Sequence, residues 1–396
     1  MRLPTATETE FIEQHLEADV GQLALRLSSA PANDRAFLMG QISGHQCIRD
    51  KIPSWYGRTD LLLPPALALE QCSSERTARY KASLCAGQSL CDLTGGFGVD
   101  FTFMAPQFER ATYVERQPDL CRIVRHNANA LGMSGIEVCN ADAADFLARS
   151  TERFTCIFID PARRDATGGK VVLLEQCQPN LAELYAPLLG RCHVLLAKLS
   201  PMLDISAALR LMPQTADVHV VAVGGECKEL LFVSRSDDAV DEPNIHCINL
   251  LGGDEEQRFV FTRSHEQAAQ CGYADRPLAY LYEPNAAILK AGAFRAVAQA
   301  FALLKLHPHS HLYTADTAVD DFPGRRFRVV DSFGASTAEA SRHLADVGAA
   351  NIATRNFPES VAQLRRRLRL DDGGEVYLFA TTLAGGQRGI VRCAKG

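Results

Sequence analysis

Between about residue 76 and residue 235, short apolar segments alternate with amphipathic helical patterns, and this alternation constrains the fold more than any other feature. The apolar segments are rich in β-branched residues and span residues 89–93, 111–115, 136–140, 156–160, 194–199 and 218–223. Helical patterns such as 120–131 and 173–188 lie between them. Strands joined by helices form a parallel sheet that is covered on both faces. Residues 230–234 follow closely enough to add an antiparallel seventh strand, so we expect an α/β domain with seven strands.

The rest of the chain predicts further domains, because 396 residues exceed what a single hydrophobic core usually holds. Residues 1–75 show apolar residues at helical spacing and predict an N-terminal helical region. Residues 51–56 interrupt the helical pattern and hold the only tryptophan, Trp55, which we interpret as a buried anchor, with a base-stacking surface as the less favoured reading. Residues 76–240 hold the alternating pattern, and an Asp-rich stretch with Pro243 predicts a linker.

Beyond the linker, residues 245–324 and 325–396 predict two small α+β domains. Strands are expected near 259–262, 278–282, 311–314, 326–331, 350–356, 375–381 and 389–393, and helices over 287–304, 338–346 and 361–370. This alternation of short strands and single helices is typical of ferredoxin-like units.

Composition excludes several classes of protein. A formal net charge of −6 argues against a protein that coats nucleic acid. The longest apolar stretch, 61–69, is interrupted by Pro64 and Pro65, so we expect no membrane span. The acidic N-terminus does not resemble a signal peptide, and the 13 cysteines show no C-x-x-C spacing. We therefore expect reduced thiols, a cytoplasmic location and no metal site, and we interpret His307, His309 and His311 as loop residues.

The strongest chemical signal is a glycine-rich turn between a predicted strand and a predicted helix, at residues 90–100. Gly95, Gly96 and Gly98 allow the backbone to approach a ligand closely. Asp92 precedes the turn and can accept hydrogen bonds from an amino group of that ligand.

Acidic residues follow the next three strands. Glu115 ends the second strand, 23 residues after Asp92, where an acid points at the ribose hydroxyls of a bound nucleoside. Asp142 follows the third strand, in reach of an adenine amine, and Asp160 ends the fourth. Dinucleotide dehydrogenases have a similar first half, but the turn here is D-x-T-G-G-F-G rather than G-x-G-x-x-G. The four acids around one turn predict a nucleoside site.

Residues 92–100 resemble motif I of the class I S-adenosylmethionine-dependent methyltransferases, in the Thr-containing form of the guanine-N2 RNA methyltransferases. The likeness runs from 62–65 and 70–75 to Ser234. Residues 282–292 (YEPNAAILKAG) and the C-terminus resemble the bacterial THUMP-like methyltransferase family. The resemblance implies a Rossmann-like class I methyltransferase domain followed by ferredoxin-like and THUMP-like domains. It also implies S-adenosylmethionine as cofactor, held by Asp92, Thr94, Gly95, Gly96, Gly98, Asp100, Glu115, Asp142 and Ala143.

The segment Asp160-Pro161-Ala162-Arg163 is implied to face the methyl acceptor. Amino-group methyltransferases usually have D/N-P-P followed by an aromatic residue that stacks on the base. Here Asp160 and Pro161 could still orient an amine, and the guanidinium of Arg163 could stack on a base. We therefore expect Asp160, Pro161 and Arg163 to be the catalytic residues of an enzyme that methylates a base nitrogen.

Two alternatives remain open. The same segment also resembles the RNA uracil-C5 methyltransferases, but those need a nucleophilic cysteine after the fifth strand, where this chain has Lys198-Leu199-Ser200-Pro201. The second alternative is a protein that binds cofactor or RNA without catalysis.

A basic segment near the C-terminus suggests the partner. Residues 325–370 contain nine arginines and no lysine, against four acids. Arginine forks suit phosphate groups, so we expect a structured RNA, such as tRNA or rRNA, to bind here. The candidate RNA-binding residues are Arg164, Arg325, Arg326, Arg365, Arg366, Arg367 and Arg369.

Overall fold

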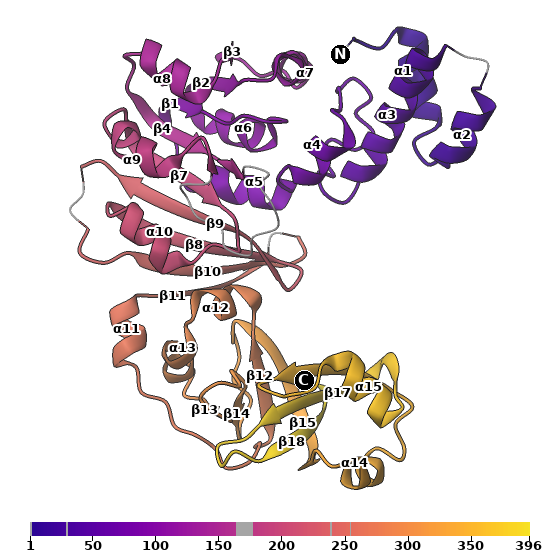
Figure 1. Ribbon diagram of the computed structural model, residues 1–396, viewed down its shortest axis with the longest axis vertical. Coiled ribbons are helices and arrows are strands. Elements are labelled where there is room, and N and C mark those ends of the chain that lie inside the picture. Colours follow the sequence, from indigo (N-terminus) through magenta and orange to yellow (C-terminus); the bar gives the residue numbers. More distant parts are fainter. Residues whose placement is uncertain (1, 29–30, 164–176, 238–239, 254) are drawn as a thin grey trace. The chain divides into compact units, whose positions relative to one another are not determined.

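The structure, a computed structural model, describes residues 2–28, 31–163, 177–237, 240–253 and 255–396. The chain divides into two compact units (Figure 1). The first consists of Met1–Ala216 and Leu231–Val240, and the second of Asp217–Leu230 and Asp241–Gly396. The division falls within strands β8 (Thr215–Val223) and β9 (Glu226–Arg235), so each unit is discontinuous in sequence. In the described part of the chain, no helix is long and apolar enough to cross a membrane.

The N-terminal part of the first unit is helical, as expected. It contains α1 (Ala6–Gln14), α2 (Val20–Arg26), α3 (Ala32–Ile48), α4 (Ala66–Gln71) and α5 (Glu75–Ala82). A capping box opens α1, because Thr5 and Glu8 each accept a hydrogen bond from the other's backbone N–H. Trp55 is 3% exposed, and its ring packs edge-on against Phe97. The tryptophan is therefore a buried anchor and not a base-stacking surface.

The first unit is built on a sheet whose central strands are parallel. β1 (Gly87–Asp92) pairs with β2 (Phe108–Glu115) and with β4 (Phe154–Ile159), while β3 (Ile136–Asn140) pairs with β2 and β7 (Cys192–Leu199) with β4. These strands have the order β8-β9-β7-β4-β1-β2-β3 within a nine-stranded sheet. Gly224 and Gly225, both at positive φ, join β8 to β9 in the two-residue turn that suits an antiparallel hairpin. These seven strands thus have the arrangement predicted for a class I methyltransferase.

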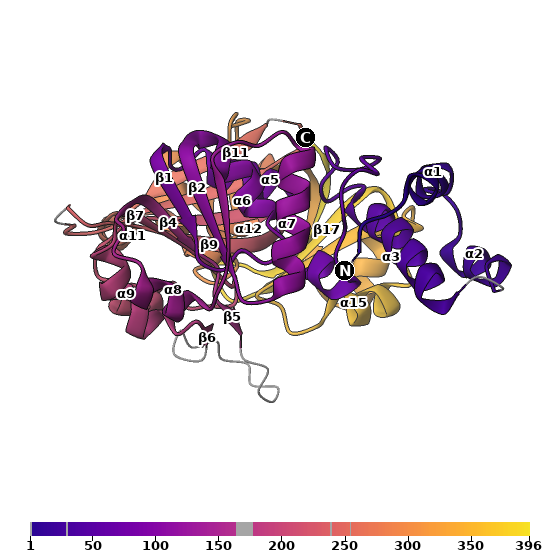
Figure 2. The ribbon, with the colours of Figure 1, turned by 90° about the horizontal axis from the view of Figure 1, so that it is seen from above.

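Helices cover both faces of this sheet. α6 (Val99–Met104) and α7 (Pro118–Ala130) lie with α5 on one face, and α8 (Ala143–Arg149) and α9 (Leu181–Leu189) lie on the other (Figure 2). A 3₁₀ turn (Ala105–Gln107) leads into β2, and α10 (Ile205–Leu211) precedes β8. Two short strands, β5 (Ala162–Arg163) and β6 (Cys177–Gln178), pair antiparallel. Because parallel strands end at one edge, the residues that follow β1, β2, β3, β4 and β7 meet there.

Part of the helical pattern expected over 173–188 falls outside the described residues, since the structure describes nothing between residues 163 and 177. The helix of this segment, α9, begins at Leu181, where Asn180 caps it by accepting a hydrogen bond from the Ala182 N–H.

The described residues of the second unit add two strands beyond β8 to the nine-stranded sheet and form a separate seven-stranded sheet. β8 pairs parallel with β10 (Asn244–Leu250), which pairs antiparallel with β11 (Glu256–Phe261), and α11 (Arg263–Ala268) follows. The seven-stranded sheet has the order β13-β14-β12-β15-β18-β17-β16. Its strands are β12 (Tyr280–Pro284), β13 (Leu304–Lys305), β14 (Tyr313–Ala315), β15 (Gly324–Gly334), β16 (Ala349–Arg355), β17 (Asp371–Thr382) and β18 (Arg388–Lys395).

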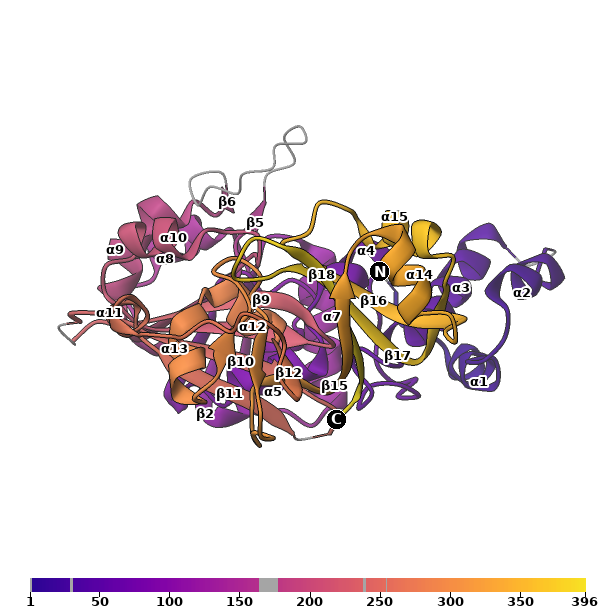
Figure 3. The ribbon, with the colours of Figure 1, turned by 90° about the horizontal axis from the view of Figure 1, so that it is seen from below.

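Two helices, α14 (Thr337–His343) and α15 (Val361–Leu368), cover the part of this sheet formed by β16, β17 and β18 (Figure 3). Their apolar residues Ala340 and Leu364 pack with Leu378 and Ile390 of the strands in one buried cluster. The C-terminal strands therefore have a core of their own.

The prediction of a single helix over residues 287–304 is wrong. The segment forms α12 (Ala286–Ala291), α13 (Phe294–Ala300) and the short strand β13. Gly292 ends α12 in the left-handed conformation, at φ +82°, and its N–H donates to the Ile288 carbonyl oxygen. The apolar periodicity continues across Gly292, but the backbone turns there, as it commonly does at a glycine that follows a helix.

Candidate active site

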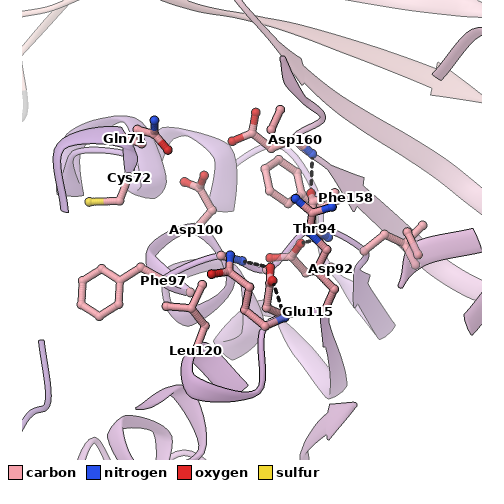
Figure 4. A pocket seen from close by; sticks show the side chains of 18 of the residues that line it. Gln71, Cys72, Asp92, Thr94, Phe97, Asp100, Glu115, Leu120, Phe158 and Asp160 are labelled. Carbon is pink, nitrogen blue, oxygen red and sulfur yellow. Dashed lines mark hydrogen bonds between the residues drawn. The ribbon is translucent and has the colours of Figure 1, made fainter. Parts of the chain in front are cut away.

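An open pocket of about 240 Å³ lies in the first unit, at the carboxyl ends of β1, β2, β3, β4 and β7 (Figure 4). Its lining includes Asp160 and all nine residues that the sequence suggests for cofactor binding: Asp92, Thr94, Gly95, Gly96, Gly98, Asp100, Glu115, Asp142 and Ala143. The structure therefore brings together residues from four separate strand ends.

The glycines of the turn have different structural reasons. A Cβ atom at Gly95 would lie 2.0 Å from the ring of Tyr113, which β2 places beneath the turn. Gly98 has φ +81° and caps α6, and a Cβ there would lie 2.7 Å from Val124. These two glycines fit the turn against the protein, so the sequence-based account of them as ligand-approach positions is incomplete. The Tyr113 hydroxyl donates to the Gly96 carbonyl oxygen and fixes the turn further.

Asp92 is a buried acid at the end of β1. It is 1% exposed and accepts a 3.0 Å hydrogen bond from the Thr94 N–H. Burial raises the pKa of its carboxyl group well above the ordinary value, an effect that the hydrogen bond only partly offsets. Within the described residues, no cation pairs with it. A ligand that brings an ammonium group into the pocket would supply the missing partner.

Glu115 and Asp142 already hold backbone amides. Glu115, at the end of β2, accepts from the Gly96 N–H at 3.0 Å and from the Gln117 N–H at 2.8 Å. Asp142 is the N-cap of α8 and accepts from the Ala144 N–H at 2.9 Å. Each carboxylate oxygen has two lone pairs, so both groups can still accept bonds from hydroxyl or amine groups.

The turn after β4 lies beside the glycine-rich turn. The Asp160 N–H donates to Thr94 Oγ1 at 2.6 Å, and Pro161 behind it is buried. The Asp160 side chain is 36% exposed and faces the pocket. Arg163 lies in β5, but its side chain is not among those described, and Arg164 lies outside the described residues. Gln178 and Pro179 complete this side of the pocket.

Sequence reasoning missed Lys198, which lines the pocket from β7. Its Nζ pairs with Asp160 Oδ2 and lies 3.8 Å from Asp100 Oδ2. Asp100 also pairs with Lys81 Nζ at 3.2 Å and accepts from Ser73 Oγ at 2.7 Å. Burial alone would raise the pKa of Asp100, but the two lysines hold it below its usual range. The signal in the sequence was a charged residue near the end of an otherwise apolar strand.

The six arginines of the second unit that the sequence suggests for RNA binding fall into two groups. Four of them have partners within the unit. Arg365 donates to backbone carbonyls and to Asp372, and Arg367 donates to Glu359. Arg325 donates to Glu283, and Arg326 donates to Asp320. Arg366 and Arg369 are exposed, and the side-chain bond given for Arg366 goes to a carbonyl of its own helix.

A ferredoxin-like domain model matches residues 280–323, and a THUMP domain-like model matches residues 324–395. A protein of Porphyromonas gingivalis W83, whose crystal structure is described as that of a methyltransferase, is 35% identical. It aligns over 98% of this chain and 98% of that chain with a TM-score of 0.89. This chain belongs to the same family. We refer to it below as the THUMP-like methyltransferase family.

Other solved structures are more distant. An rRNA methylase from Streptococcus thermophilus is 12% identical over 40% of this chain and 95% of that chain, with a TM-score of 0.31. A protein from Streptococcus mutans, described as a methyltransferase in complex with SAH, is 12% identical over 41% of this chain and 96% of that chain, also with a TM-score of 0.31. No curated protein matches the sequence. The assignment to the family therefore rests on the Porphyromonas protein.

The pocket fits S-adenosylmethionine, the cofactor that this fold family uses. The cofactor carries an ammonium group, which suits the uncompensated and buried Asp92. Its ribose carries two hydroxyl groups, which suit a carboxylate placed like Glu115. A Cβ atom at the turn residue Gly96 would meet the Thr94 carbonyl oxygen at 3.8 Å, an ordinary contact, so the turn is less crowded here than at Gly95 and Gly98 and leaves room for a ligand.

Proposed function

We propose that this member of the THUMP-like methyltransferase family transfers a methyl group from S-adenosylmethionine to an exocyclic amine of a base in structured RNA. The observation that carries the proposal is the position of Asp160: a half-exposed carboxylate on the turn after β4, tied by its backbone to the glycine-rich turn. An acceptor held by Asp160 lies next to the proposed cofactor residues.

The cofactor supplies an electrophilic methyl group on a sulfonium when it is bound. The protein residues then have simple tasks. Asp92 would pair with the ammonium group, Glu115 would bind the ribose hydroxyls, and Asp142 and Ala143 would hold the adenine end. Asp160 and the carbonyl oxygen of Pro161 accept hydrogen bonds from the acceptor amine, which raises its nucleophilicity and aligns its lone pair. As the new N–C bond forms and the bond from the methyl carbon to sulfur breaks, the amine loses one proton, which the Asp160 carboxylate accepts and passes to solvent.

The C5-pyrimidine alternative needs an activated thiol near the acceptor. Among the described residues that line the pocket, Cys72 is the one cysteine. Its Sγ donates to the Leu69 carbonyl oxygen, and burial raises the pKa of its thiol, so little nucleophilic thiolate forms. In Figure 4 its sulfur points away from Asp160. These features favour nitrogen methylation.

RNA is the proposed substrate class because a THUMP domain-like model matches the C-terminal residues and because exposed arginines lie there. Arg366 and Arg369 are the candidates best placed to meet phosphate groups. Arg365, Arg367, Arg325 and Arg326 first serve contacts within the unit, so their RNA contacts would have to share those roles. The binding of tRNA or rRNA remains a prediction, and so does the cytoplasmic location of the enzyme.

The test is methyl transfer in vitro. Purified protein and radiolabelled S-adenosylmethionine are mixed with total RNA from a strain that lacks the gene, and label in the RNA is counted. We expect label with the wild type and none with Asp160→Ala, while the variant still binds the cofactor. Cofactor binding without label in any RNA would favour the non-catalytic alternative, and label in the Asp160→Ala reaction would remove Asp160 from the acceptor site.

A further inference from the structure

Lys198 has no task in the cofactor contacts above, yet it lies between two carboxylates of the pocket. Its Nζ pairs with Asp160 Oδ2 on one side and lies 3.8 Å from Asp100 Oδ2 on the other. The side chain is 14% exposed, and its neighbours in β7, Ala197 and Leu199, are buried. A lysine in such a strand loses hydration, so its position between two acids needs a reason.

The contacts behind Lys198 fix it from the protein core. Asp100 is held by Lys81, whose side chain is fully buried and whose Nζ lies 3.2 Å from Asp100 Oδ1. Ser73 Oγ donates to Asp100 Oδ2 at 2.7 Å. The alternating charges Lys81, Asp100, Lys198 and Asp160 thus form a chain from the core to the pocket, which we call the ion-pair chain. Two lysines and two aspartates balance, so the chain adds no net charge next to a cationic cofactor.

Asp160 stands at the pocket end of this chain and is held from two directions. Its backbone N–H donates to Thr94 Oγ1, which fixes the turn, and Lys198 holds the side chain through one carboxylate oxygen. Lys198 is the one cation that the described residues place against Asp160. In Figure 4 the carboxylates of Asp100 and Asp160 lie close to one another in the pocket. Without Lys198, the half-exposed carboxylate would be free to turn into solvent.

We propose that Lys198 is a positioning residue of the acceptor site. Because Lys198 binds Oδ2 of Asp160, Oδ1 is left to accept a hydrogen bond from an N–H group of the acceptor amine. This inference rests on the proposed function, in which Asp160 receives the acceptor. A displacement of about 1 Å in a group that aligns the reactants costs about a hundredfold in rate. Loss of Lys198 therefore slows the transfer step. It spares the cofactor, because Lys81 and Ser73 still hold Asp100, and the other proposed carboxylate ligands lie at the ends of β1, β2 and β3.

The experiment compares Lys198→Met, which keeps the length of the side chain but removes its charge, with Lys198→Arg and with the surface control Lys228→Met. Lys228 also lies on a strand and pairs with an acid, but that pair is exposed. For Lys198→Met we expect kcat with RNA to fall about a hundredfold, with little change in the KM for RNA and in the affinity for S-adenosylhomocysteine. Lys198→Arg restores part of kcat, and Lys228→Met behaves as wild type.

A crystal structure of Lys198→Met with S-adenosylhomocysteine gives a readout that needs no activity: we expect the cofactor product in place and the Asp160 carboxylate turned away. An unmoved Asp160, or an affinity for S-adenosylhomocysteine that falls as much as kcat, would overturn the assignment. If Lys198→Met does not fold, the same two measurements on Lys198→Gln decide. An inactive wild type would instead refute the proposed function, while the orientation of Asp160 in the variant still tests Lys198.

Discussion

Asp92 is buried at a cost that the bound cofactor is expected to offset. Because burial raises the pKa of its carboxyl group in the folded protein, the folded state holds the proton more tightly than the unfolded state. The contribution of Asp92 to stability is therefore most favourable when it is protonated at low pH, and it falls as the pH rises and the buried group ionises. The ionised form is also the one that can pair with an ammonium group.

Replacement Asp92→Asn should separate stability from binding. The amide oxygen can still accept from the Thr94 N–H, but the buried charge is gone. We expect a higher melting temperature for the ligand-free variant at about pH 8, with the difference vanishing toward about pH 4. Cofactor affinity should fall at least tenfold, about 1.4 kcal/mol. Thermal melts across pH and calorimetry check both; a variant less stable than wild type at about pH 8 would contradict this account of the buried carboxylate.

The affinity of the wild type for S-adenosylmethionine should also depend on pH. Below the raised pKa of Asp92 the carboxyl group is protonated and cannot pair with the ammonium group, so the affinity should rise with pH and then level off. Calorimetry at several pH values measures this. The Asn variant serves as the control, since it should lose the dependence; the same slope in both proteins would assign it to another group.

Glu115 joins two tasks, since it fixes the glycine-rich turn and is proposed to bind ribose. Glu115→Ala removes both, and we expect cofactor binding at least tenfold weaker, because bonds to a charged group are worth about 1.5–3 kcal/mol. Glu109→Ala, an exposed acid at the other end of the same strand, should have no effect. Equal affinities for all three proteins in calorimetry would place the ribose elsewhere.

At the scale of elements, the turn between β1 and α6 depends on close packing with Tyr113 of β2. A Cβ atom at position 95 would lie 2.0 Å from that ring. We expect Gly95→Ala to destabilise the protein by about 1–3 kcal/mol, as overpacking usually does, and to abolish cofactor binding. Gly40→Ala in α3, where no atom lies within 4 Å of the added Cβ, should instead stabilise by about 0.5–1 kcal/mol. Melting temperatures measure both; an unaffected Gly95→Ala would show that the turn adapts.

The helix α15 and its C-cap carry two kinds of arginine: some bond to groups within the unit, and others are exposed. We expect Arg366→Gln with Arg369→Asn to raise the KM for RNA and to reduce the salt slope of binding by about 0.7–0.9 for each lost phosphate contact. The melting temperature should not change. Arg365→Gln with Arg367→Gln should lower it, because both side chains bond to carbonyls and acids of the unit. Arg26→Gln, exposed on α2, is the control; normal RNA binding by the first pair would exclude this surface.

At the scale of the whole molecule, the spacing of the acidic residues predicted the fold of the first unit, because residues at the carboxyl ends of parallel strands lie at one edge of the sheet. Asp92, Glu115, Asp142 and Asp160 meet in one pocket for that reason. Lys198 escaped prediction because its significance depends on partners from α6 and the turn after β4, far away in sequence. The paired arginines escaped it because charge density alone does not reveal partners such as Glu283 and Glu359.

The central claim is that this protein methylates an exocyclic amine of an RNA base. The most direct measurement is mass spectrometry of nucleosides from digested RNA of wild-type cells, of a deletion strain, and of that strain carrying the Asp160→Ala gene. The account predicts one N-methylated nucleoside that is present in the wild type and absent from the other two. Identical nucleosides in all three strains, or the loss of a C5-methylated pyrimidine instead, would contradict it.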